Sequence, residues 1–233
     1  MLLPIPGIAR EGAPQMRCNH IILRCIRASR SDSKEAYMKN GKIKRMVGMA
    51  FLVAMVVVLQ LIGGIIPPIG GVSLSLVLIP IVIGAAVYGP SGGAILGAVF
   101  GIIVYVACVN GTDPGGAMVF QANPWLCFIV VMGKGILAGL AAGLVYRFFR
   151  AKQVNGYLAM LMAAIVCPVV NTGIFLTCMA LFYGDVLTAW ANGSPVLTYV
   201  LSALVVMNFL PELALNVIFS PAGERIAQVV KKS

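Results

Sequence analysis

The sequence predicts an all-α membrane protein with six transmembrane helices. Of its 233 residues, 60% are hydrophobic and only 10% are charged, whereas a soluble domain carries about 25% charged residues. The apolar residues form continuous runs of about 20 residues, which is long enough to cross a bilayer as helices. Continuous runs also exclude a transmembrane β-barrel, because barrel strands alternate apolar and polar residues.

The six apolar runs are separated by helix-breaking residues or by loops. They are Val47–Ile66, Val72–Tyr88, Gly92–Val109, Pro124–Phe149, Tyr157–Tyr183 and Val196–Ser220. Gly63-Gly64 and Pro67-Pro68 end the first run, since neither pair continues a helix. Pro80 is expected to bend the second run, and Pro168 is expected to interrupt the fifth. The segment 110–123 is predicted to be a polar, turn-rich loop.

The second and third runs meet at Gly89-Pro90-Ser91-Gly92 with almost no loop, which predicts a tight helical hairpin. Small residues also recur at every fourth position in two of the runs. These are Gly93, Gly97 and Gly101 in the third run, and Gly135, Gly139 and Gly143 in the fourth. In lipid such spacing lets helix backbones approach closely, so we expect close packing along both stripes.

Lys and Arg are concentrated before the first run, between the fourth and fifth, and after the sixth. They are Lys39, Lys42, Lys44 and Arg45, then Arg147, Arg150 and Lys152, and finally Arg225, Lys231 and Lys232. Basic loops stay on the cytoplasmic side. Both termini are therefore predicted to be cytoplasmic in a multi-pass plasma-membrane protein. This placement explains the net charge of +10 without a nucleic-acid partner.

Three parts are predicted along the chain. Residues 1–45 form a basic, disordered N-terminal extension, residues 46–220 the membrane domain, and residues 221–233 a basic cytoplasmic tail. Residues 1–37 fit three alternatives: a disordered tail, an amphipathic surface helix, or an extension produced by choosing too early a start codon. We favour the third, because Met38 opens a basic lead-in to the first helix.

Lys134 and Glu212 are charged residues that the sequence places inside the apolar layer. A charge there costs at least about 2.5–3.5 kcal/mol on insertion scales, so it faces a protein interior or a cavity. Lys134 lies about ten residues, or roughly 15 Å, from the outer end of its helix. Asn171 and Asn208 lie about twelve residues from the outer ends of theirs, at the same rise per residue. Three helices thus bring polar groups to one depth, which predicts a solute pocket opening beneath the 110–123 loop.

Structural roles compete with this pocket. Lys134 and Glu212 could form an ion pair that joins the fourth helix to the sixth. Asn171 and Asn208 could form hydrogen bonds between helices. For the aromatic residues Phe120, Trp125 and Trp190, we favour anchoring at the membrane interface over stacking on a solute.

Catalytic and metal-binding motifs are missing from the sequence. It contains no GxxxxGK[ST], HExxH or GxSxG motif, so neither an enzyme nor a cofactor is predicted. Its six cysteines form no CxxC pair and no metal-like spacing with His20, so no metal site is predicted either.

Three segments carry a family resemblance. They are LSLVLIPIVIGAAVYGPSGGAILGAVFGI (74–102), Gln121-Ala122-Asn123-Pro124 and GILAGLAAGLVYRFF (135–149). They resemble the substrate-binding S components of energy-coupling factor (ECF) vitamin transporters, in the branch with pantothenate-type members and members of unassigned substrate. The resemblance covers about Met46 to Ser220 and implies the six-helix S-component bundle.

The resemblance also implies a function and partners. Such a protein captures a vitamin or related micronutrient from outside, here favouring a pantothenate-like carboxylate, and delivers it with a membrane T subunit and two ATPases.

An AxxxA motif on the family's first helix contacts the T subunit, and Ala50 and Ala54 match it. By position, Asn123, Lys134, Asn171 and Asn208 fall in the family's solute pocket. Together with Glu212, which lies one turn deeper than Asn208, these four are the five expected substrate-binding residues. Lys134 is expected to pair with an anionic group of the solute.

Two functions from other classes stay open. One is a proton-coupled small-solute carrier, or a membrane enzyme, that uses Lys134 and Glu212 as a proton pair. The other is a membrane scaffold that binds no solute.

Overall fold

The computed structural model describes residues 43–64 and 76–232, and every regular element among them is helical. Contacts group the chain into two units, Met1–Val47 and Gly48–Ser233. Of the first unit, only residues 43–47 are described, and they are helical. The predictions for residues 1–37, with Met38 as an alternative start, lie outside the described residues. Residues 43–45, which the predicted disordered extension included, are helical.

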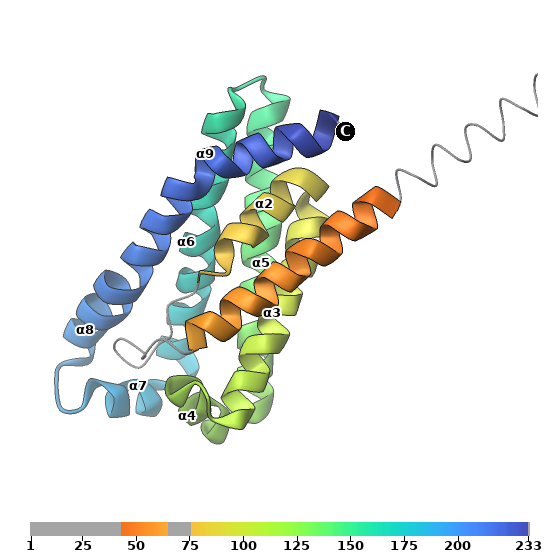
Figure 1. The fold of residues 1–233 in the computed structure, drawn as a ribbon. Coiled ribbons are helices and arrows are strands. Elements are labelled where there is room, and N and C mark those ends of the chain that lie inside the picture. Colours follow the sequence, from red (N-terminus) through yellow and green to blue (C-terminus); the bar gives the residue numbers. More distant parts are fainter. Residues whose placement is uncertain (1–42, 65–75, 233) are drawn as a thin grey trace, which may run out of the picture. The chain divides into compact units, whose positions relative to one another are not determined.

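The described elements, in chain order, are the Ile43–Gly64 helix, α2 (Leu78–Tyr88), α3 (Pro90–Asn110), α4 (Pro114–Ala122), α5 (Pro124–Ala151), α6 (Gly156–Phe182), α7 (Gly184–Ala191), α8 (Val196–Tyr199), the π-helix η1 (Val200–Phe209) and α9 (Leu210–Lys232). From α2 on, the helices are joined by short connections, and α8, η1 and α9 continue one another as a single helical stretch (Figure 1).

Five helical stretches in the described residues are long and apolar enough to cross a membrane. They are Ile43–Gly64, Pro90–Asn110, Pro124–Ala151, Gly156–Phe182 and Val196–Val230. This confirms an all-α membrane protein. The second predicted run appears as α2, which has 11 residues and is shorter than a bilayer core. Because that run was predicted to begin at Val72, outside the described residues, the sixth span stays a prediction.

The two prolines expected to disturb helices do not break them. α6 continues through Pro168 from Gly156 to Phe182, and this proline is buried in the core. Pro80 is the third residue of α2, and proline is tolerated in a first helical turn because the N–H groups there have no intrahelical partner. Neighbouring helices therefore hold α6 together at a residue that sequence rules treat as a breaker.

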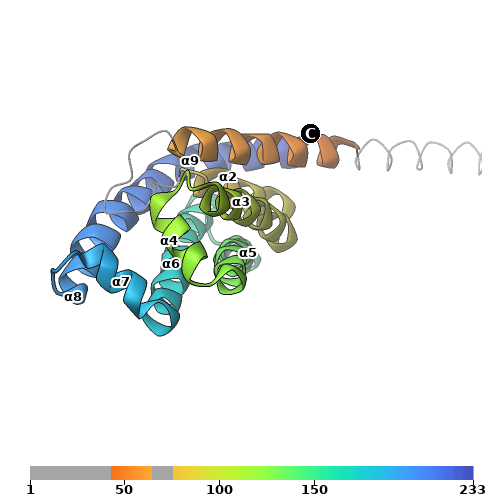
Figure 2. The same cartoon turned by 90° about the horizontal axis from the view of Figure 1, so that it is seen from below.

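The predicted 110–123 loop and the connection between the fifth and sixth apolar runs each contain a short helix. The 110–123 segment contains α4, which begins at Pro114 directly after Asp113, and the segment after Phe182 contains α7. These two helices contact each other at one end of the Gly48–Ser233 unit (Figure 2). At the other end, α9 continues past Ser220 and through Pro221. Most of the predicted tail, 221–233, is therefore helical.

α3 and α5 pack with their backbones in contact along the two glycine stripes. A Cβ atom placed on Gly93 would overlap the carbonyl of Gly139, and one on Gly97 would overlap the carbonyl of Gly135. The reverse substitutions meet the same partners. The expected close packing is thus confirmed, and each stripe is the other's partner.

At the end opposite α4 and α7, a hydrogen-bonded carboxylate ties α9 to α5. Glu224 is only 1% exposed. It accepts hydrogen bonds from the Tyr146 hydroxyl at 2.9 Å and from Gln228 Nε2 at 3.1 Å. A buried carboxylate is tolerated when such donors replace water, so this cluster fixes the direction of α9 after Pro221.

We predict that Gly97→Ala lowers the free energy of unfolding by about 1–3 kcal/mol, the usual cost of overpacking a tight core. Its new methyl group must displace the Gly135 backbone. Gly173→Ala in α6 is the matched control, because a Cβ there meets nothing within 4 Å. Unfolding of the purified variants in detergent measures both, and equal stability would contradict the packing.

Candidate functional site

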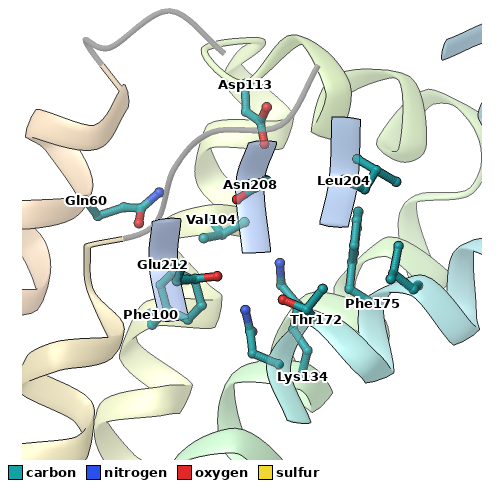
Figure 3. A pocket seen from close by; sticks show the side chains of 12 residues that line it. Gln60, Phe100, Val104, Asp113, Lys134, Thr172, Phe175, Leu204, Asn208 and Glu212 are labelled. Carbon is teal, nitrogen blue, oxygen red and sulfur yellow. The ribbon is translucent and has the colours of Figure 1, made fainter. Parts of the chain in front are cut away.

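One polar cavity lies where several helices meet near the α4 and α7 end. We call it the polar chamber. It is lined by Gln60, Phe100, Val104, Asp113, Lys134, Asn171, Thr172, Phe175, Leu176, Leu204, Asn208 and Glu212. The side chains of Lys134, Asn208 and Glu212 converge there from α5, η1 and α9 (Figure 3). Four of the five predicted substrate-binding residues therefore share one cavity.

Lys134 contacts aromatic rings rather than a carboxylate. Its ammonium lies 4.8 Å from the ring centroid of Phe175 and 5.8 Å from that of Phe100, which is the geometry of a cation–π contact. Within the described part of the chain, no ion pair joins Lys134 to Glu212. The ion pair that the sequence left open is therefore not formed, and the cation remains available to an anionic solute.

Three oxygen atoms around the polar chamber are buried without a hydrogen-bond partner among the described residues. They belong to the side chains of Asp113, Asn171 and Glu212. Asn171 is 6% exposed and Glu212 is 3% exposed. Leaving a buried polar group unpaired costs about 1–3 kcal/mol. The chamber therefore combines one cation with three acceptors that donor groups of a solute could satisfy.

The π-helical segment η1 carries Asn208 to the wall of the polar chamber. Asn208 lies in η1, one residue before its end, and Glu212 lies in the first turn of α9. Four residues separate the two, so their side chains share one helix face. Local π-helical widening is frequent at functional sites, and here it occurs where the last long helix passes the chamber.

Asn123 does not line the chamber, and the structure gives it another role. Its side-chain oxygen accepts a hydrogen bond from the backbone N–H of Leu126 at 3.1 Å, which caps the N-terminus of α5. Its carbonyl accepts a hydrogen bond from the Tyr183 hydroxyl at 3.1 Å. Asn123 therefore caps α5 and holds the Tyr183 side chain against the start of that helix.

The sequence did not predict several chamber residues. Asp113 is the only charged residue of the 110–123 segment, but its position became clear only with α4 folded back over the bundle. Thr172 and Phe175 follow Asn171 by one and four residues, so helical spacing could have placed Phe175 beside it. Gln60 is the only strongly polar side chain of the first apolar run, and this isolated polarity could have indicated that it faces a cavity.

Ala50 and Ala54 lie on an exposed face of the Ile43–Gly64 helix. On the same helix, Leu52 is 7% exposed and Val56 is completely buried. The two alanines leave a shallow, small-residue surface flanked by the exposed Phe51. Small residues at such positions allow close approach of another membrane helix.

Comparison with known proteins identifies similar sequences. The family described as "ECF transporter, substrate-specific component" matches residues 44–222. The "Pantothenic acid transporter PanT" of Lactococcus lactis subsp. cremoris (strain MG1363) is 31% identical over 196 residues, which cover 79% of this chain and 94% of that protein.

Removing the Asn123 cap should weaken the fold. Asn123→Ala is expected to lower the free energy of unfolding by about 0.5–2 kcal/mol, as for other N-cap losses. Asn123→Ser should retain most of the stability, because serine also caps helices. Chemical unfolding of both variants in detergent tests this, and equal losses in the two would show that capping is not what the side chain contributes.

Proposed function

The chain belongs to the family of ECF transporter substrate-specific components, and we propose that it captures pantothenate in the polar chamber. Membership of the family makes the protein a multi-pass plasma-membrane subunit that serves transport and is not an enzyme. The observation that carries the proposal is the single cation of the chamber, Lys134, among buried acceptors that have no partner within the described residues.

The chemistry of pantothenate matches this set of groups. Its carboxylate pairs with the ammonium of Lys134, a charge-assisted contact. Its two hydroxyls and its amide N–H supply donors for the oxygens of Asp113, Asn171 and Glu212. The PanT relative bears the name of a pantothenic acid transporter, which supports the same solute here.

The two carboxylates of the chamber favour a hydroxylated acid over a simple one. An acid without hydroxyls would leave the oxygens of Asp113 and Glu212 unpaired, whereas the hydroxyls of pantothenate can donate hydrogen bonds to them. A site that loses buried hydrogen bonds rejects a ligand more strongly than one that loses apolar contact. The acceptors therefore provide specificity, while Lys134 provides most of the attraction for the carboxylate.

We further propose the partners and orientation that belong to this function. The subunit works with a membrane T subunit and two ATPases, has six spans and keeps both termini in the cytoplasm. The exposed helix face that contains Ala50 and Ala54 binds the T subunit. In this orientation the α4 and α7 end faces outward, and the exposed Arg147 and Lys152 lie on the cytoplasmic side.

Lys134→Met should weaken pantothenate binding by about 10- to 150-fold, because hydrogen bonds to charged groups contribute about 1.5–3 kcal/mol. Lys134→Arg should retain more of the affinity, since it keeps the charge. Titration calorimetry on the purified protein measures the dissociation constants. Lys152→Met, which removes an exposed cation, is the control and should bind like the parent. Unchanged affinity in Lys134→Met would overturn the proposed role.

Ala54→Phe should separate partner assembly from solute capture. A large ring on the exposed alanine face prevents close helix approach, so we expect loss of co-purification with the T subunit at unchanged pantothenate affinity. Ala180→Phe, on an exposed position of α6, should affect neither property. Full assembly of Ala54→Phe with the T subunit would place that contact elsewhere.

A further inference from the structure

A second cavity adjoins the polar chamber and has the opposite character. We call it the apolar chamber. The two share Val104, Asp113, Lys134 and Phe175 in their walls, so they meet at Lys134. The apolar chamber continues toward α4 and α7, and its further lining includes Cys108, Val119, Cys127, Val130, Val131 and Trp190. Most of these side chains come from α3, α4 and α5, near the points where those helices end or begin.

The apolar chamber contains one unpaired polar group of its own. The indole N–H of Trp190 is buried and has no acceptor among the described residues, although the side chain belongs to the chamber wall. Tryptophan N–H is only a donor, and a buried indole normally finds a partner. The polar chamber has acceptor oxygens without a donor among the described residues, and the apolar chamber has a donor, the Trp190 indole N–H, without an acceptor among them, so one elongated solute could satisfy both.

Resting on the proposed function, we propose that the apolar chamber is the second half of a two-part solute site. The carboxylate end of the solute lies at Lys134, and a branched apolar group with a terminal oxygen lies in the apolar chamber, where that oxygen accepts a hydrogen bond from Trp190. In pantothenate, the dimethyl-substituted part with its terminal hydroxyl is this group. The solute therefore spans the junction, with its carboxylate on the polar-chamber side of Lys134 and its branched end toward α4 and α7, where its terminal hydroxyl can also donate to Asp113, which lines both chambers.

The two tryptophans of the chain allow a direct test. Trp125 is 82% exposed and lines neither chamber, so Trp125→Phe leaves Trp190 as the only tryptophan reporter. Pantothenate should shift the fluorescence of this variant and reduce its quenching by acrylamide. β-Alanine, which has the carboxylate without the branched group, should leave the Trp190 signal unchanged. In calorimetry, Trp190→Phe should weaken pantothenate binding about three- to tenfold, the usual effect of one lost hydrogen bond. Trp125→Phe should bind like the parent.

The outcomes separate this inference from the function on which it rests. Calorimetric binding of pantothenate that depends on Lys134 but leaves both the Trp190 signal and the Trp190→Phe affinity unchanged overturns the apolar subsite alone. A lack of any pantothenate binding overturns the function and the subsite together. If Trp190→Phe does not fold, which thermal unfolding without solute reveals, the fluorescence of Trp125→Phe decides the question, because that variant keeps Trp190.

Discussion

The direct backbone contact between α3 and α5 is the constraint on which the geometry of the polar chamber depends. Glycines at matching positions, such as Gly97 and Gly135, leave no room for a shift along or around either helix. That register places Phe100 of α3 beneath Lys134 of α5. Because an α-helix turns by about 100° per residue, a change of one residue in this register would turn Lys134 away from the chamber. The glycines therefore position the Lys134 ammonium although none of them lines the polar chamber.

The other half of the site is less tightly constrained by its own sequence. α6, η1 and α9 supply Asn171, Asn208 and Glu212, but no glycine stripe joins them to the α3–α5 pair. Their positions depend on side-chain packing and on the hydrogen-bonded Glu224 at the far end of α9. The half of the site formed by α3 and α5 is thus rigid and carries Lys134. The half formed by α6, η1 and α9 is held by side-chain packing and carries Asn171, Asn208 and Glu212.

Much of this arrangement could be predicted, and the failures have physical reasons. Composition and run length predicted the long helices, and the four-residue spacing predicted the glycine contact. Counting residues from helix ends brought Lys134, Asn171 and Asn208 to one depth, because the rise per residue is constant. The same counting could not place Asp113 or show that Asn123 caps a helix. Both depend on the path of α4 between longer helices, which tertiary packing decides. Pro168 was misjudged because its local cost is offset by burial in the core.

Glu212 and Glu224 are two buried carboxylates of one helix in different environments. Both lie on α9, and both are almost fully buried, at 3% and 1% exposed. Glu224 accepts two hydrogen bonds from side chains, so its burial is compensated within the fold. Glu212 keeps an oxygen without a partner among the described residues and faces a cavity that contains a cation. A fold selected for stability alone would have paired or replaced it. Its unpaired state therefore favours a solute, rather than the protein, as the source of the missing donor.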